Sequence, residues 1–269
     1  MPPREARVPE GVDPTLPSVA RIYDYLIGGK DNYAADRTAA RQFVELVPEV
    51  PKIARANRDF LVRCVRFLAE AGVRQFIDLG AGIPTSPNVH EVARQVQPDA
   101  RVVYVDHDPV VLAHGRALLA TDDGVAVVRA DLREPDQVLG DPAVTRLIDF
   151  SQPVAVLLLS VLHFIGEEEG ASRIVAGYRD RLSPGGYLVI STGSNEGSQD
   201  TETDRRLREL YKSAGTPLVG RSSKQVMEFF EGCELEEPGL VQSGQWRPDH
   251  WAQSRPTQIF MLAGVGRKL

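Results

Sequence analysis

Five short apolar runs, separated by longer segments with helical periodicity, constrain the fold of this chain more than any other feature of its sequence. None of the runs alternates apolar with polar residues, which is typical of strands that helices cover on both faces of a parallel sheet. Two further strands are expected near the C-terminus, as an antiparallel pair at one edge of the sheet. The predicted strands are 76–79, 102–106, 126–130, 154–159, 187–192, 235–241 and 258–263.

Three helices are expected before the first strand. Ser18 can cap the first of them, and Gly28 and Gly29 can end it in a left-handed turn. Pro48 and Pro51 are expected to end the second helix. The predicted helices are 19–27, 34–46 and a third from near Asn57 to Gly72.

The chain divides into three parts on this pattern. Residues 1–17 are rich in proline and charge and lack apolar periodicity, so we expect a mobile tail there. Residues 18–56 are predicted to form an N-terminal helical cap, and residues 57–269 one α/β domain. Within that domain, 193–231 is predicted to be a helical insertion with helices at 202–214 and 223–231.

Composition argues against several kinds of protein. A net charge of -6 without a segment dense in Lys or Arg weighs against nucleic acid as a partner. No run of about eighteen apolar residues occurs, so we expect no membrane span or signal peptide and a cytoplasmic location. Cys64 and Cys233 lie far apart, which predicts neither a metal centre nor a redox motif. The oligomeric state is not predicted.

A glycine-containing turn follows the first predicted strand, in the segment Asp78-Leu79-Gly80-Ala81-Gly82. Glycines let the backbone turn tightly and approach a ligand closely. A dinucleotide fingerprint needs a third small residue for close packing of the following helix. Here the segment Pro84-Thr85-Ser86-Pro87 intervenes and delays that helix. The turn is therefore wider than a pyrophosphate needs.

Polar residues also stand at the ends of the next three predicted strands. Asp106 follows Gly82 at a distance typical of an acid that accepts hydrogen bonds from ribose hydroxyls. Asp131 offers a carboxylate where an adenine amino group could be recognised, and Ser160 and His163 end the fourth strand. Because ligands of open α/β sheets bind outside the carboxyl ends of the strands, these residues are expected to share one site.

The order of these motifs resembles the class I S-adenosylmethionine-dependent methyltransferases: Asp-x-Gly-x-Gly, an acid after strand two, Ala-Asp-Leu after strand three, Val-Leu-His after strand four, and Leu-Ser-Pro-Gly-Gly-Tyr-Leu-Val-Ile. More narrowly, segments 20–33 and 82–91 resemble an actinobacterial family of S-adenosyl methyltransferases, formerly a domain of unknown function. The resemblance implies a Rossmann-like, seven-stranded, mostly parallel sheet with helices on both faces and an antiparallel last strand. It also implies S-adenosyl-L-methionine as cofactor.

The resemblance assigns roles position by position. Gly80 and Gly82 would face the methionine part of the cofactor, and Asp78 would orient its amino group. Asp106 would bind the ribose, and Asp131 with Leu132 the adenine. His107 and Ser160 are also assigned to the cofactor site. The acceptor would be a small molecule with an oxygen, nitrogen or carbon nucleophile, in a pocket that the helical insertion helps to close.

His163 has two interpretations. The run Val161-Leu162-His163, followed by acidic residues, resembles small-molecule O-methyltransferases in which this histidine is the general base. Phe164 departs from that pattern, because those enzymes have Asp at this position. The alternative is a structural role.

The N-terminal helix also has two interpretations. It could form a lid, with Tyr23 and Tyr33 near the sulfonium and Arg55 or Arg58 near the methionine carboxylate. Alternatively, its aromatic residues pack on the sheet and the polar turn that follows is solvated. For Trp246, Arg247 and Trp251, a packed edge loop is favoured over a substrate clamp.

Two other functions remain open on the sequence. A regulatory or scaffold protein could bind S-adenosylmethionine without turnover. A nicotinamide-dependent oxidoreductase shares the general fold, but the missing third glycine and the lack of a Tyr-x-x-x-Lys pair near the sheet edge weigh against it.

Overall fold

The computed structural model describes residues 12–119, 122–196, 201–248 and 261–269. They form an eight-stranded sheet in the order β3-β2-β1-β4-β5-β8-β6, with β7 also paired to β8. β1 to β5 are parallel, whereas β8 runs antiparallel to β5, β6 and β7. The strands are β1 (Gln75–Leu79), β2 (Arg101–Asp106), β3 (Val125–Arg129), β4 (Ala155–Leu159), β5 (Tyr187–Gly193), β6 (Cys233–Leu235), β7 (Val241–Gln242) and β8 (Met261–Lys268).

The predicted fold class is confirmed, with differences at the C-terminal edge. The strand expected at 235–241 is two short strands, because Pro238 and Gly239, which has φ +85°, interrupt it. The last strand runs from Met261 to Lys268, further toward the C-terminus than expected. Of the predicted span 258–263, residues 258–260 lie outside the described residues.

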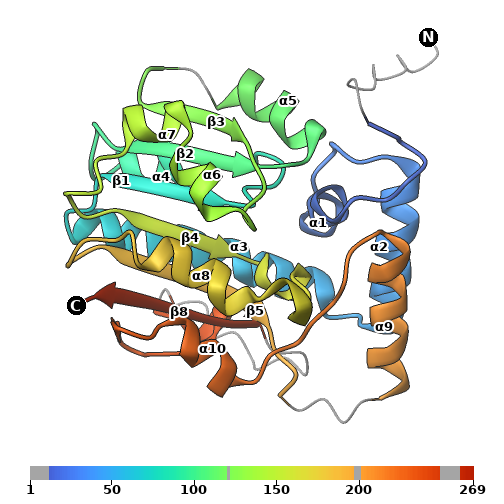
Figure 1. Ribbon diagram of the computed structural model, residues 1–269. Helices are drawn as coiled ribbons and strands as arrows, with labels where there is room; N and C mark the ends of the chain where they lie inside the picture. Colours follow the sequence, from blue (N-terminus) through green and yellow to red (C-terminus); the bar gives the residue numbers. More distant parts are fainter. Residues whose placement is uncertain (1–11, 120–121, 197–200, 249–260) are drawn as a thin grey trace.

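Helices cover both faces of the sheet, as the uninterrupted apolar strands predicted. Every residue of β1 and of β4 is buried. One face packs against α3 (Val50–Glu70) and α4 (Val89–Arg94). The other packs against α6 (Pro135–Leu139), α7 (Pro142–Leu147), α8 (Ala171–Arg179) and α10 (Ser223–Phe229), which lie in front of the sheet in Figure 1.

The first two helices, α1 (Val19–Ile27) and α2 (Ala34–Leu46), agree with the prediction. The third does not, because α3 begins at Val50 and includes Pro51 in its first turn. A proline there removes no intrahelical hydrogen bond, so Pro51 opens this helix instead of ending the previous one. Residue 57, the predicted start of the α/β domain, therefore lies inside a helix.

The N-terminal cap packs against α9, the first helix of the predicted insertion, although the two lie far apart in the sequence. Figure 1 shows α9 (Glu202–Ser213) alongside α2. Ile22, Leu26 and Phe43 from the cap share one apolar cluster with Leu207 from α9. The cap helices and α9 thus form one helical unit at one side of the sheet, whereas α10 packs on the sheet itself.

The loop before β8 contains a buried aromatic residue. Trp246 is fully buried, edge-on to Phe60 and Phe67 of α3, and Arg247 lies over the ring of Phe67 at 3.9 Å. These two residues are packed, as predicted, and Trp251 lies outside the described residues.

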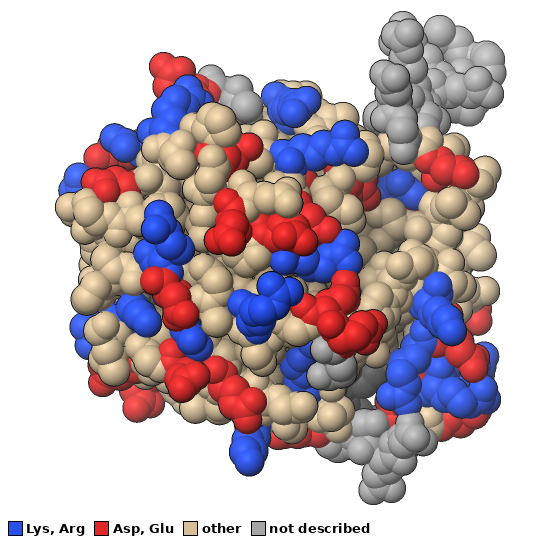
Figure 2. All heavy atoms as spheres, viewed as in Figure 1, with Lys and Arg blue, Asp and Glu red and all other residues tan. Residues whose placement is uncertain are grey.

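Acidic and basic side chains are interspersed over the face of the molecule shown in Figure 2. In the described part of the chain, no helix combines the length and the apolar character that crossing a membrane requires.

Candidate functional site

A cavity of about 710 Å³ lies at the carboxyl ends of β1 to β4. Because β2 and β4 flank β1 on opposite sides, this position is the topological switch point of the sheet, where open α/β sheets bind ligands. Helices α1, α3 and α9 contribute the opposite wall. The predicted site residues that line it are Tyr23, Arg58, Asp78, Gly80, Gly82, Asp106, His107, Asp131, Leu132, Ser160 and His163.

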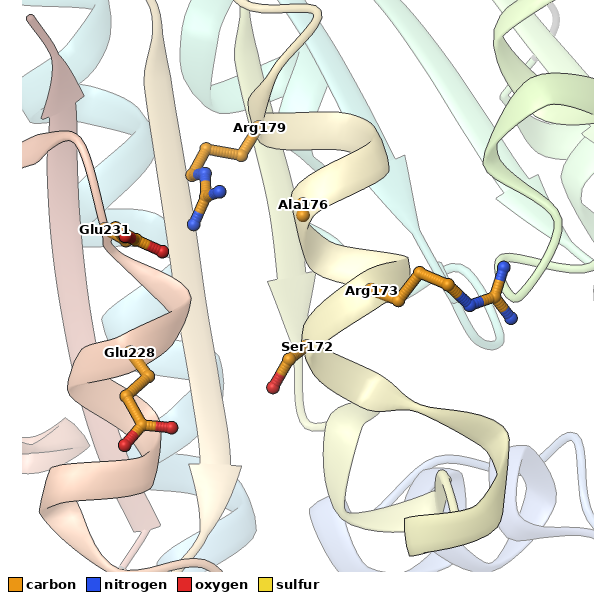
Figure 3. Close-up of a pocket in the computed structure, with 6 residues that line it drawn as sticks. All are labelled: Ser172, Arg173, Ala176, Arg179, Glu228 and Glu231. Atoms are coloured by element: carbon orange, nitrogen blue, oxygen red, sulfur yellow. The ribbon is translucent and has the colours of Figure 1, made fainter.

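A second, shallower hollow of about 550 Å³ lies between α8 and α10 (Figure 3). Its most buried charge, Arg179, already pairs with Asp180 and donates to the carbonyl of Phe229. Arg173 points away from α10 in this view. We therefore place the candidate site in the larger cavity.

The glycine turn is held from one side and open on the other. The backbone N–H groups of Gly80 and Ala81 donate to the carbonyl of Val105 at 2.8 and 3.2 Å. Gly80 has φ +71°, and a Cβ there would lie 2.4 Å from Cγ1 of Val161. Gly82 has φ +65°, but a Cβ there would meet no described atom within 4 Å. Gly80 is thus needed for packing, whereas Gly82 borders open cavity.

Asp106 connects two of the loops that surround the cavity. Its carboxylate accepts hydrogen bonds from the backbone N–H groups of Gly82 and Asp108, both at 2.9 Å. Burial raises the pKa of Asp106, and these two hydrogen bonds partly offset the increase. The His107 ring is exposed beside it. Each carboxylate oxygen keeps a second acceptor position for a ligand hydroxyl.

Asp78 is a buried acid, and no cationic side chain among the described residues is in contact with it. Its side chain makes no hydrogen bond within the described part of the chain, and the residue is 5% exposed. Burial raises the pKa of Asp78 to about 7; Arg58 opposes this increase, and Asp106 adds to it. A buried carboxylate is costly unless an opposite charge compensates it. A cationic ligand group at Asp78 would supply that charge.

Arg58 holds the loop that follows the glycine turn. Its Nη2 atom donates to the carbonyls of Thr85 and Pro87, and the latter bond is 2.5 Å long. Its Nε atom is buried without a hydrogen-bond partner in the described structure. The loop delays α4 until Val89, as predicted. An anionic ligand group at this wall of the cavity would pair with the charge of the Arg58 guanidinium.

The loop after β3 is fixed by side chains. Arg133 donates to both carboxylate oxygens of Asp131 and also pairs with Glu169. The hydrogen bonds from Arg133 lower the pKa of Asp131. The hydroxyl of Tyr178 donates to the carbonyl of Leu132 at 2.8 Å. Asp131 is therefore anionic and held in place at the cavity wall.

A chain of hydrogen bonds connects the end of β4 with the cap. The N–H of Ser160, whose φ is +59°, donates to Oγ of Ser191 at 3.0 Å, and that hydroxyl donates to Oδ1 of Asn57 at 2.6 Å. The Asn57 amide donates to the Tyr23 hydroxyl at 3.2 Å, which donates to the carbonyl of Ala54 at 2.9 Å. Sequence reasoning missed Asn57 and Ser191. Each could have been found in the sequence as a polar residue within an otherwise apolar segment: Asn57 on a helix face and Ser191 in a strand.

Replacing Tyr23 with phenylalanine is expected to lower the free energy of unfolding by about 1–2 kcal/mol, because two buried partners lose their hydrogen bond. Tyr25→Phe is the matched control, since the Tyr25 hydroxyl makes no hydrogen bond within the described residues. It should change stability by less than about 0.5 kcal/mol. Urea unfolding measures both variants, and equal losses would contradict the hydrogen-bond chain.

Tyr33 does not line the cavity. It caps α2, with Arg21 over its ring at 5.1 Å. The turn before it is tied to the cap, because the Asp24 carboxylate accepts from the N–H of Asp31 and the amide of Asn32. Tyr23 thus lies at the cavity, whereas Tyr33 supports the helix that follows it.

The segment before α1 also borders the cavity. Residues 12–17 belong to the predicted tail, yet Val12, Leu16 and Pro17 line the cavity wall. The hydroxyl of Ser18 donates to Asp108 at 2.7 Å and joins this segment to the loop after β2.

His163 is buried in the cavity wall, with 5% of its surface exposed. Burial, together with the positive charge of Arg221, lowers the pKa of His163 to about 3, so its ring is neutral. The N–H of Gly193 donates to Nδ1 at 3.2 Å, which assigns the ring proton to Nε2. This geometry favours a hydrogen-bond donor over a general base.

A parallel sheet with an antiparallel strand between β5 and β6, and a cavity lined by a glycine turn and strand-end acids, defines a Rossmann-like, S-adenosylmethionine-dependent methyltransferase. The chain belongs to the S-adenosyl methyltransferase family, whose sequence model matches residues 5–269. S-adenosyl-L-methionine is its cofactor. These findings identify an enzyme and favour neither the oxidoreductase nor the binding protein without turnover.

Two solved structures are similar over nearly their whole length. A DUF574 family protein from Streptomyces avermitilis is 42% identical, with a TM-score of 0.90, and the match covers 96% of this chain and 99% of that one. A protein from Thermobifida fusca, described as a candidate methyltransferase, is 44% identical, with a TM-score of 0.88 and coverage of 96% and 97%. No curated protein matches this chain.

Proposed function

We propose that this enzyme transfers a methyl group to a small-molecule acceptor that binds under the helical cap. The observation that carries the proposal is the extent of the cavity, which contains both the strand-end residues and an apolar wall from α1 and α9. Small-molecule sites occupy roughly 300–1,000 Å³ and are mainly apolar, with a few convergent polar groups. The cavity has that size and character.

The charges at the strand ends suit the two ends of an amino acid. We assign the amino group of the methionine moiety to Asp78 and its carboxylate to the guanidinium of Arg58. Gly82 leaves room beside the turn, and Asp106 and His107 would hold the ribose. Leu132 and the fixed carboxylate of Asp131 would contact the adenine.

The cofactor supplies a methyl group activated by a positively charged sulfur. The role of the protein is then to align the acceptor behind that methyl group and to exclude water, and alignment alone can account for much of the acceleration. The cap contributes Tyr23 and Leu26 to the cavity wall, and the insertion contributes Leu207 and Tyr211. We propose that both segments order the acceptor.

Cofactor affinity is expected to rise with pH up to about 7 and then to level off. Asp78, with a pKa of about 7 before the cofactor binds, must release its proton to pair with a cationic amino group. Below that pKa the affinity should fall by up to roughly tenfold per pH unit. Calorimetry at about pH 6 and about pH 8 measures the change. Asp78→Asn should flatten the profile, and a flat profile in the unaltered enzyme would contradict the assignment.

Methyl transfer itself is tested with S-adenosylmethionine that carries a labelled methyl group, incubated with the enzyme and a host-cell extract. Separating small molecules from macromolecules shows where the label goes. We expect label in the small-molecule fraction. Label confined to nucleic acid or protein would contradict a small-molecule acceptor, and cofactor binding without any labelled product would contradict turnover.

A further inference from the structure

The part of the cavity that faces the cap is lined by aromatic rings from three separate elements. The ring of Tyr211 on α9 lies 4.4 Å from Phe43 on α2 and 5.3 Å from Phe164, measured between ring centroids. The Phe164 ring in turn lies 4.1 Å from the His163 ring. We call these four residues the acceptor compartment. All four line the cavity, and their flat faces suit a planar, apolar molecule.

Two hydrogen-bond donors border this compartment. His163 carries its ring proton on Nε2, since Nδ1 accepts from Gly193. Burial raises the pKa of Tyr211 to about 12, so its hydroxyl keeps its proton. Neither Nε2 nor the hydroxyl has a partner in the described structure, and neither is among its fully enclosed unpartnered atoms. Both atoms therefore keep surface that a ligand in the cavity can reach.

A buried positive charge lies behind the compartment. Arg221 is 3% exposed and donates to the carbonyls of Leu162 and Ile165 at 2.6 and 2.9 Å, on either side of His163 and Phe164. The positive charge of Arg221 helps to lower the pKa of His163. Such a field favours an anion beside His163 and disfavours a cation. The Asp24 carboxylate, which α1 contributes to the cavity wall, already accepts hydrogen bonds from the N–H of Asp31 and the side-chain amide of Asn32.

We infer, on the basis of the proposed function, that the acceptor is a planar, apolar molecule whose nucleophilic oxygen is already ionised at neutral pH. His163 Nε2–H and the Tyr211 hydroxyl hold that oxygen. An aromatic carboxylate and an acidic phenol both have this chemistry. The oxygen forms the new bond to the methyl carbon as the carbon–sulfur bond breaks, and the electron pair of that bond remains on sulfur. No proton leaves, so no base is required.

The binding test uses the enzyme saturated with S-adenosylhomocysteine and four naphthalene probes: the 2-carboxylate, an acidic nitrated 2-naphthol, the 2-methanol and the 2-methylamine. Calorimetry gives the affinity of each probe. We expect the carboxylate or the acidic phenol to bind best and the amine worst, by roughly tenfold or more. The anion that binds more tightly shows whether the ionised oxygen of the acceptor belongs to a carboxylate or to a phenol. Better binding of the neutral or cationic probe, or no binding of either anion, overturns the inference.

Variants test the two donors. Tyr211→Phe is expected to weaken anion binding roughly tenfold and to weaken binding of the neutral probe less, since a hydrogen bond to a charged group contributes more than one to a neutral hydroxyl. His163→Gln, which keeps a side-chain N–H, should lose much less affinity than His163→Leu. Tyr25→Phe, outside the cavity, is the matched control. If His163→Gln and His163→Leu lose the same affinity, the hydrogen bond assigned to His163 is wrong. If Tyr211→Phe weakens the anionic and neutral probes equally, the hydrogen bond assigned to Tyr211 is wrong.

Failure of this inference differs visibly from failure of the proposed function. If labelled methyl enters small molecules but the product is a methylated amine, and Tyr211→Phe leaves its formation unchanged, the proposed function stands and this inference falls. If no small molecule is labelled while the anionic probes still bind, the proposed function falls instead.

Discussion

Gly80→Ala is expected to weaken S-adenosylmethionine binding by more than roughly 100-fold, which corresponds to about 3 kcal/mol. Two effects combine at this residue. Its φ of +71° strains any residue with a side chain, and the new methyl group would lie 2.4 Å from Val161. The turn has to move away from Val161, and movement in that direction displaces Gly82 and its hydrogen bond to Asp106. Calorimetry with S-adenosylmethionine measures the loss.

Gly72→Ala is the matched control for Gly80→Ala. Gly72 also has a positive φ, +93°, but an added Cβ there meets nothing within 4 Å and the residue does not line the cavity. Backbone strain alone should cost about 1–2 kcal/mol of stability and leave cofactor affinity unchanged. If the affinity of the Gly80→Ala variant for the cofactor is within a few-fold of that of the unaltered enzyme, the glycine turn does not bind the cofactor.

Asp78→Asn is expected to stabilise the cofactor-free protein and to weaken cofactor binding. The folded-state pKa of about 7 lies above the ordinary value of 3.8, so folding becomes less favourable as pH rises between these values. At about pH 8 the ionised carboxylate costs up to about 4 kcal/mol, which asparagine avoids. The same substitution removes the charge proposed for the amino group, and affinity should fall roughly 10- to 100-fold.

Denaturant unfolding of the cofactor-free protein measures this trade-off. The gain in stability should be largest at about pH 8 and should vanish below about pH 3, where Asp78 is protonated in both states. Asp99→Asn is the control, since Asp99 forms an exposed ion pair with Arg74 that contributes little. Loss of stability at about pH 8, or unchanged cofactor affinity, would refute the role given to Asp78.

The parts of the site that lie close to one another in the chain could be predicted from the sequence. The glycine turn follows an apolar strand directly, and Asp106 and Asp131 each stand at or just beyond the end of such a strand. Parallel strands bring their ends to one edge of a sheet, so the grouping of these residues follows from local patterns. Tyr33 was assigned to the cofactor from its neighbours in the sequence, but it caps a helix instead.

The parts that depend on distant contacts could not be predicted. Periodicity indicates that α2 and α9 are helices, but not that they pack together and close one cavity. Tyr211 gave no signal, because its significance comes from Phe43 and Phe164 on other elements. The proton on His163 is likewise assigned by Gly193, which lies at the end of β5, 30 residues further along the chain. Such features depend on tertiary packing, which overrides local propensity.

A crystal structure of the enzyme with S-adenosylhomocysteine tests the central claim most directly. We expect the amino group at Asp78, the carboxylate at the Arg58 guanidinium, the ribose at Asp106 and the adenine against Leu132. The sulfur should then face the compartment formed by Phe43, Phe164, Tyr211 and His163. A ligand bound away from the carboxyl ends of the strands, or with its adenine in that compartment, would contradict the assignment of both the cofactor and the acceptor site.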